Sequence, residues 1–234
     1  AWQLSLDSMS LAKVSQRAEN SVVGKETGLS DHIPSLLGED NRAILFDSRS
    51  LDSDQIGFPL SERNLALLVI DTGVEHVTDL GAERFSEREE ASDAIGISSL
   101  RELSPKALPD HREALSDVAY RRAQHIVNEN QRVLDATKAL RTEGPEALGE
   151  ILNASQASLR DDYEVSGKEI DLAVETCIAQ GAYGARMVGI GDSGALYALV
   201  DESALSLLQV ALDGAFSEHG YQAPATYVVG PSRG

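Results

Sequence analysis

The order of the elements expected near the C-terminal end constrains the fold of this chain more than any other feature. A helix over about 168–180 precedes a strand over 183–190, a tight turn and a second strand over 195–200. Apolar residues at helical spacing then mark a helix around 205–216, and a last short strand covers 227–229. Helix, strand, strand, helix, strand is the order of a split βαβ arrangement. It predicts the α+β class, with an antiparallel sheet and helices packed against it.

The preceding part of the chain is expected to be largely helical. Apolar residues on one face predict a long amphipathic helix over about 115–140, and Pro145 is suited to the first turn of another. Further upstream, residues 43–46 and 65–70 have the apolar, turn-bounded pattern of strands, and residues 5–20 that of a helix.

Charge and composition narrow the range of partners. Twenty Lys and Arg against 38 Asp and Glu give a formal net charge of -18, which excludes a nucleic-acid partner and disfavours an anionic membrane surface. No apolar run approaches the roughly 18 residues needed to span a bilayer. The single cysteine, Cys177, permits no internal disulfide and fits a reducing compartment. We therefore expect a cytoplasmic protein, and a small anionic ligand such as a nucleotide stays compatible with this charge; the oligomeric state is not predicted.

The segment Gly189–Gly194 has the form G-x-G-x-x-G, and it contains Gly-Asp-Ser-Gly. A dinucleotide fingerprint must be followed by a helix, whereas residues 195–200 have the pattern of a strand. The Gly-Asp-Ser-Gly loop of serine proteases belongs to all-β proteins, usually with disulfides, which this chain does not resemble. Both interpretations of the Gly189–Gly194 turn therefore fail in context. As a separate point, the five histidines do not have the spacing of a metal site.

Two carboxylates near predicted helix ends are ambiguous on the residues alone. Asp31, followed by His32, is most simply the N-cap of a short helix, and Glu19 is most simply a solvent-exposed residue at a helix end.

The segment 153–166, which contains Ser-Leu-Arg-Asp-Asp-Tyr-Glu-Val-Ser, resembles the galactokinase family of the GHMP kinases. Shorter segments agree with the same family in the same order along the chain: 16–20, 28–31, 47–51, 69–72, 129–130 and 184–187. The resemblance covers essentially the whole chain and implies a GHMP-kinase type α+β fold.

The resemblance implies transfer of the ATP γ-phosphate to the anomeric hydroxyl of galactose. Asp31 matches the family's catalytic aspartate and would also contact the sugar, accepting the proton of its hydroxyl. Glu19 matches the carboxylate that holds Mg²⁺. Gly81 falls where the family has a sugar-contacting tyrosine.

The glycine turn matches the family's third signature, so the resemblance assigns Gly189, Gly191 and Gly194 to nucleotide binding. Asp192 and Ser193 replace Phe-Gly in that signature. A carboxylate 4 Å from a phosphate charge would cost about 4 kcal/mol per unit charge pair at an effective dielectric constant of 20.

Other departures lie outside the turn. Val188 replaces a threonine and Gln156 a histidine, while Ser30 and His32 replace the Met and Gln that flank the catalytic aspartate.

The resemblance also predicts the domain organisation: 1–75 a remnant of the N-terminal lobe and 76–234 the C-terminal lobe. The family's first sugar motif and its phosphate-binding loop would lie upstream of Ala1, so we expect the isolated chain to be inactive. Two alternatives remain open. One is a non-catalytic sugar sensor or degenerate paralogue, and the other is a kinase for another sugar, because Gly81 leaves room near the hexose ring.

Overall fold

The computed structural model describes residues 6–23, 27–74, 80–189 and 194–234. The chain forms two compact units, one of residues 1–59 with 230–234 and one of residues 60–229. We call them unit 1 and unit 2. The two units are defined by contacts within the chain and divide it after Pro59. The lobe boundary expected after residue 75 stays a prediction. In the described residues, every helix is too short or too polar to cross a bilayer.

Unit 1 contains two helices and a two-stranded antiparallel sheet: α1 (Ser8–Val23), α2 (His32–Leu37), β1 (Arg42–Phe46) and β2 (Ser53–Gly57). Ala12 and Ile33 are its most deeply buried apolar residues on the two helices. The C-terminal end of the chain belongs to this unit, because the Gly234 N–H donates to Gly38 O over 3.1 Å. The strand predicted at 43–46 is β1.

Unit 2 is built on a four-stranded antiparallel sheet in the order β4-β5-β3-β6. Its strands are β3 (Leu65–Asp71), β4 (Gly184–Met187), β5 (Ala195–Asp201) and β6 (Ala225–Val229). In the register, Leu68 of β3 lies opposite Ala198 on one side and Val228 on the other. The predicted α+β class and antiparallel sheet are confirmed, although β4 ends at Met187 and not at residue 190.

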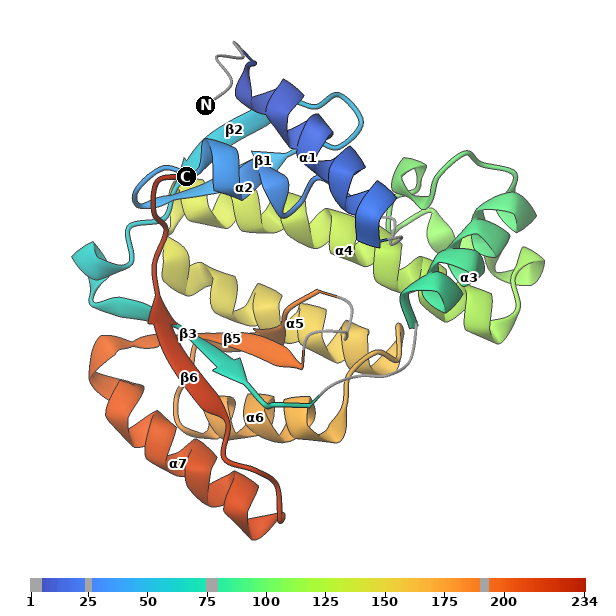
Figure 1. Cartoon of the computed structure of the whole chain (residues 1–234). Coiled ribbons are helices and arrows are strands. Elements are labelled where there is room, and N and C mark those ends of the chain that lie inside the picture. The colour runs from blue at the N-terminus through green and yellow to red at the C-terminus, as the bar shows by residue number, and fades with distance from the viewer. Residues whose placement is uncertain (1–5, 24–26, 75–79, 190–193) are drawn as a thin grey trace. The chain divides into compact units, whose positions relative to one another are not determined.

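The described part of unit 2 also contains the helices α3 (Leu80–Ile95), α4 (Asp117–Thr142), α5 (Leu148–Asp161), α6 (Lys168–Ala179) and α7 (Leu205–Glu218) (Figure 1). Helices α5, α6 and α7 pack against the sheet, whereas α3 packs against α4. The main core joins the sheet to α6 and α7 through apolar side chains that are almost fully buried: Leu68, Ile70, Ala173, Leu196, Leu208, Leu212 and Phe216. A second apolar cluster joins α3 to α4 around Ala91, Ala123 and Val127. Pro145 begins a 3-10 turn, Pro145–Ala147, that leads into α5.

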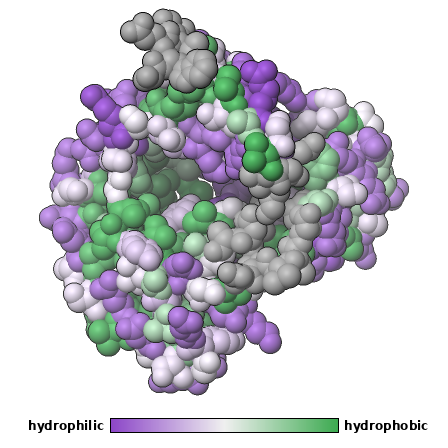
Figure 2. Space-filling model, viewed as in Figure 1, coloured by the Kyte–Doolittle hydropathy of each residue, from purple (hydrophilic) through white to green (hydrophobic). Residues whose placement is uncertain are grey.

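The two edges of the sheet differ. On β6, Tyr227, Val228 and Val229 are exposed, and apolar side chains gather over this part of unit 2 (Figure 2). On β4, the outer edge faces α5, where helix and strand approach closely at Gly149 and Gly184. A Cβ on Gly149 would lie 2.3 Å from Tyr183 O, so this approach requires glycine.

Candidate functional site

The carboxylate of Glu19 is held near the end of α1 by the loop that follows. Thr27 Oγ1 lies 3.1 Å from Glu19 Oε2 and 2.8 Å from Asn20 Oδ1, so its one proton serves either acceptor. Gln16 Nε2 donates to Thr27 O over 2.7 Å. His32 Nε2 lies 3.0 Å from Glu19 Oε2, at ion-pair distance but without hydrogen-bond geometry. The Glu19 carboxylate is therefore partly exposed and lies in contact with Thr27 and His32.

Asp31 occupies the N-cap position of α2, but its side chain makes no capping hydrogen bond. Its backbone is already helical, with φ -90° and ψ -30°, whereas a capping residue normally has extended geometry. The carboxylate is exposed, and Ser30 Oγ lies 3.5 Å from Asp31 Oδ1. The N-cap interpretation of this side chain is therefore wrong.

Asp31 and Glu19 lie at the same end of unit 1, because His32 follows Asp31 in the chain and reaches Glu19. In the part of the chain that the structure describes, no three His, Cys, Asp or Glu side chains are grouped to hold a metal ion. Mg²⁺ usually takes one or two carboxylates and completes its shell with substrate phosphates and water. Glu19, with 39% of its side chain exposed, fits the role of one such ligand.

The segment that contains Gly189–Gly194 lies between β4 and β5 in unit 2, and residues 190–193 of the predicted tight turn lie outside the described residues. Gly189 and Gly194 have φ of +65° and +62°, which favours glycine at both positions. Gly194 is also enclosed: a Cβ there would lie 2.3 Å from Val74 O. Gly191 lies outside the described residues, as do Asp192 and Ser193.

Thr72 holds the Gly194 end of this loop. It lies in the segment 69–72 that resembles the galactokinase family, but no role was predicted for it. Its N–H and Oγ1 both donate to Gly194 O, over 3.1 and 2.6 Å, and the residue is 4% exposed. The signal that could have found it is its place directly after the predicted strand 65–70. Thr27 is a second residue that sequence reasoning did not predict. Its contact with Glu19 is indicated in the sequence only by the short distance between the two along the chain.

Gly81 lies in the first turn of α3. The helix is fixed by Arg84, whose Nε donates to Tyr163 O over 2.7 Å. Gly81 and the glycine turn thus belong to unit 2, whereas Asp31 and Glu19 belong to unit 1.

Comparisons with known proteins give a consistent result. Residues 136–218 match the family described as GHMP kinases C terminal. The whole chain is 35% identical to the galactokinase of Streptomyces coelicolor, and 82% of it is 41% identical to that of Bos taurus. The galactokinase of Lactococcus lactis, solved in complex with galactose, matches the whole chain with a TM-score of 0.93 and 32% identity.

The fold and these matches show that the chain is related to the GHMP kinases. Within that superfamily, its whole length is similar to the galactokinase family. It covers 61% of the Streptomyces protein, 50% of the bovine protein and 62% of the Lactococcus chain. The chain thus spans about half to three-fifths of the length of the relatives it matches.

Proposed function

We propose that this chain supplies the base, a metal carboxylate and the third glycine signature of a cytoplasmic galactokinase. The reaction is transfer of the ATP γ-phosphate to the anomeric hydroxyl of galactose, with Mg²⁺ as the metal. The observation that carries the proposal is that the exposed carboxylate of Asp31 makes no capping hydrogen bond and directly precedes the residue His32 that contacts Glu19. A carboxylate that does not cap its own helix is available to a ligand.

Asp31 has the role of general base. The carboxylate would orient the sugar hydroxyl and accept its proton as the hydroxyl oxygen attacks the γ-phosphorus, while the bond from that phosphorus to the bridging oxygen breaks and ADP leaves. The rest of phosphoryl transfer depends on positioning and on neutralising charge. Glu19 would hold Mg²⁺ from this chain, and the metal ion would supply part of that neutralisation.

The proposed role of the glycine turn is to bring backbone groups close to the nucleotide phosphates. Gly189 and Gly194 carry no side chain to keep a ligand away, and Thr72 fixes the second of them. Gly81, at the start of α3, is the position proposed to lie near the sugar. A small residue there leaves space beside the hexose ring.

The test uses the complete product of the gene and measures galactose-dependent release of ADP. Asp31→Ala is expected to lower kcat at least about 100-fold, which is the usual range for loss of a general base. Glu39→Ala is the matched control, because Glu39 is an exposed acid of the same unit, paired with Arg42 at 3.3 Å. Turnover close to wild type in Asp31→Ala would overturn the assignment of Asp31.

A second candidate is a galactokinase-like sugar sensor without catalysis. It is favoured by Asp192, which adds a negative charge to the glycine signature, and by Gly81 in place of the sugar-contacting tyrosine. Calorimetry distinguishes the two functions. Binding of galactose without galactose-dependent ADP release favours the sensor, and release of ADP with a different hexose favours a kinase for another sugar.

A further inference from the structure

Strand β6 forms one edge of the sheet in unit 2. In the described part of the chain it pairs with β3 on one side only, and the other side of the strand has no neighbour in the sheet (Figure 1). A strand edge of this kind presents a row of backbone N–H and C=O groups with which another strand can pair. The three large apolar side chains of β6 are exposed: Tyr227 by 56%, Val228 by 57% and Val229 by 40%.

β6 lacks the features that usually protect an edge strand. Charged side chains, proline and β-bulges discourage pairing with another chain. The sequence of β6 is Ala-Thr-Tyr-Val-Val, and its pairing with β3 runs without interruption from Ala225 to Val229. Residues 220–232 contain no Asp, Glu, Lys, Arg or His, in a chain of which 25% of the residues are charged. The edge is therefore open to a strand from another molecule.

Helix α7 lies beside β6 and extends this surface. Gln209 Nε2 donates to Thr226 Oγ1 over 2.9 Å, which places this turn of the helix next to the strand. The following residue, Val210, is 69% exposed, and residues 205–212 carry no charge. We call β6 and Val210 together the β6 surface. Large exposed apolar side chains that lie together mark an interaction site on a soluble protein.

The β6 surface is complementary to a second copy of itself. When two β6 strands pair antiparallel about Tyr227, each Ala225 lies opposite the other copy's Val229, and each Thr226 lies opposite the other copy's Val228. All five residues of the strand are then paired. The two Tyr227 rings lie opposite each other, and aromatic cross-strand pairs of this kind stabilise a sheet. A two-fold axis through Tyr227 therefore uses the whole edge.

The same register keeps the helices on one face of the combined sheet. Val228 lies opposite Leu68 in the pairing with β3, and Leu68 is buried in the core that the sheet shares with α6 and α7. Residues directly opposite each other in an antiparallel pair point to the same face, so Val228 faces the helices and Tyr227 faces away from them. A register shifted by one residue would bring the helices of the two copies to opposite faces.

Charge favours a second copy over other occupants of this edge. Each copy has a formal net charge of -18, so two copies repel each other across most of their surfaces. The neutral segment 220–232 is a place where they can meet without opposing like charges. A strongly charged partner, by contrast, finds no counter-charge on the β6 surface.

We propose that two copies of this protein associate through β6, joining their four-stranded sheets into one sheet of eight strands. The contact has about ten residues on each side, below the roughly 20–30 of a standard interface. We therefore expect a weak dimer, with a Kd on the order of 10 µM. The dimer is a separate property from the proposed catalysis.

Sedimentation velocity on the complete gene product measures this association. Between about 1 and about 100 µM protein we expect a change from monomer to dimer. Raising NaCl from about 0.05 to about 0.5 M should lower the dimer Kd at least about twofold. The reason is that salt screens the repulsion between two acidic chains and leaves an uncharged contact intact.

Val228→Lys places a charge on the strand edge and is expected to raise the dimer Kd at least about tenfold. Val133→Lys is the matched control, because Val133 lies on α4, is 46% exposed and receives the same substitution. It is expected to leave the dimer Kd unchanged. Circular dichroism shows whether each variant is folded.

A cysteine at position 227 tests the register and does not depend on the lysine variant. The two-fold axis brings residue 227 of both copies to about 4.5–5.5 Å between Cα atoms, a separation that a disulfide spans. The native Cys177 does not compete, because it is fully buried and burial raises the pKa of its thiol to about 12. Under mild oxidation Tyr227→Cys should form a disulfide-linked dimer at least about tenfold faster than Val228→Cys, whose thiol lies opposite Thr226.

Each contrary result overturns a stated part of the proposal. A protein that stays monomeric at all concentrations overturns it, as does a folded Val228→Lys variant that dimerises like the wild type. A dimer that weakens with added salt shows a contact between charged groups and overturns the role of β6. Equal cross-linking of Tyr227→Cys and Val228→Cys overturns the register about Tyr227.

Hydrogen exchange identifies the other possible occupant of the edge. Slow exchange of residues 225–229 in a monomeric protein shows that another part of the complete gene product covers β6, and this also overturns the dimer. Galactose-dependent ADP release tests the proposed function in the same samples. The two proposals therefore fail independently of each other.

Discussion

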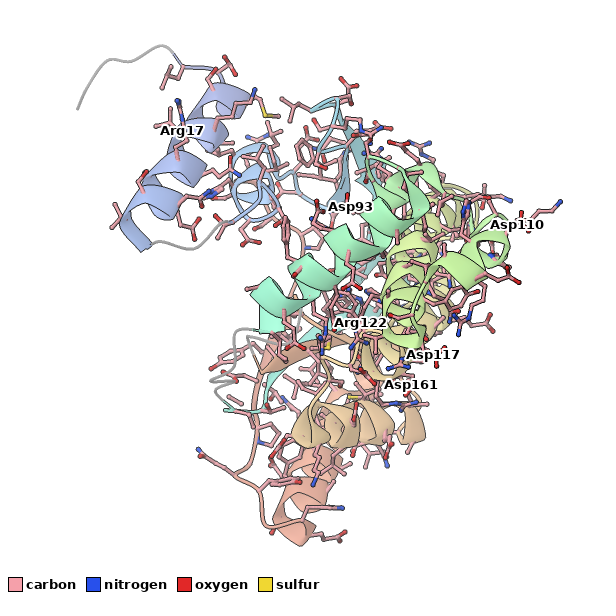
Figure 3. The ribbon with its side chains drawn as sticks, turned by 90° about the vertical axis from the view of Figure 1, so that its right-hand side faces the viewer. Arg17, Asp93, Asp110, Asp117, Arg122 and Asp161 are labelled. Carbon is pink, nitrogen blue, oxygen red and sulfur yellow. The ribbon has the colours of Figure 1, made fainter. Side chains whose placement is uncertain are left out.

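Arg122 Nη2 donates to Glu164 Oε2 over 2.6 Å and thereby holds a residue whose backbone is in the left-handed region, with φ of +55°. Arg122 lies on α4 where that helix meets α3, and its Nε donates to Glu87 Oε2 over 2.7 Å (Figure 3). Only 3% of the Arg122 side chain is exposed. One buried guanidinium therefore ties together two helices and the segment that follows α5.

Replacing Arg122 by Met should destabilise the protein by about 3 kcal/mol, because it leaves Glu87 without one of its cations in a mostly buried place. Arg121→Met is the control: Arg121 pairs with the same Glu164 at 3.3 Å but is 38% exposed, so its loss should cost at most about 1 kcal/mol. Urea unfolding monitored by circular dichroism measures both values. Equal losses in the two variants would contradict the role given to burial.

His125 makes the free energy of unfolding depend on pH, in a pH range that lies above the range in which carboxylates usually titrate. Burial lowers the pKa of His125 to about 4, below its ordinary value of 6.5. Its Nδ1 lies 3.0 Å from Ser158 Oγ, and its ring stacks on Tyr163 with 4.4 Å between the ring centroids. The neutral ring is therefore the form that the folded protein holds.

The sign follows from proton binding. Between pH 6.5 and 4 the unfolded chain binds more protons at His125 than the folded protein, so stability is full above pH 6.5 and is lost as the pH falls toward 4. Between pH 7 and pH 5 this loss should amount to about 2 kcal/mol. His125→Gln should lack that part of the slope. Parallel curves of unfolding free energy against pH for the two proteins would refute the assignment.

Gly149 and Gly184 allow the backbone contact between α5 and β4. Gly149→Ala places a Cβ 2.3 Å from Tyr183 O, a backbone atom that cannot turn away. We expect a loss of about 1–3 kcal/mol from the forced separation. Gly214→Ala in α7 is the matched helical control, since nothing lies within 4 Å of its added Cβ, and it should gain about 0.5–1 kcal/mol. Thermal unfolding compares them, and a stabilised Gly149→Ala would disprove the contact.

The α+β class and the two strands on either side of the glycine-rich segment, β4 and β5, could be predicted from the sequence because they depend on local periodicity. The helix expected over 115–140 is α4, Asp117–Thr142, displaced by two residues at each end. Helix ends depend on caps: Ser116 accepts from the Ala119 N–H through its side chain, which the apolar spacing does not show.

The site could be predicted only as separate segments. Gln156 and Met187 are 31 residues apart in the chain, and no local pattern indicates that an amide on a helix will pair with the end of a strand. The sequence predicts that the Asp31 side chain caps α2, because Asp before a helix usually does. It makes no such hydrogen bond, since the backbone of Asp31 is already helical.

The last prediction concerns Glu19 and the metal, and it rests on the proposed function. Glu19→Gln keeps an oxygen within reach of Thr27 Oγ1 but removes the charge that would attract Mg²⁺. We expect the Mg²⁺ concentration for half-maximal ADP release to rise about tenfold or more, while the unfolding free energy changes by less than about 1 kcal/mol. Glu39→Gln, in the same unit, should change neither quantity. Direct titration with Mn²⁺, followed by electron paramagnetic resonance, gives a second measurement that needs no turnover. Equal Mn²⁺ affinity in wild type and Glu19→Gln would show that Glu19 is not a metal ligand, and its carboxylate would then serve only to hold the loop from Thr27 to His32.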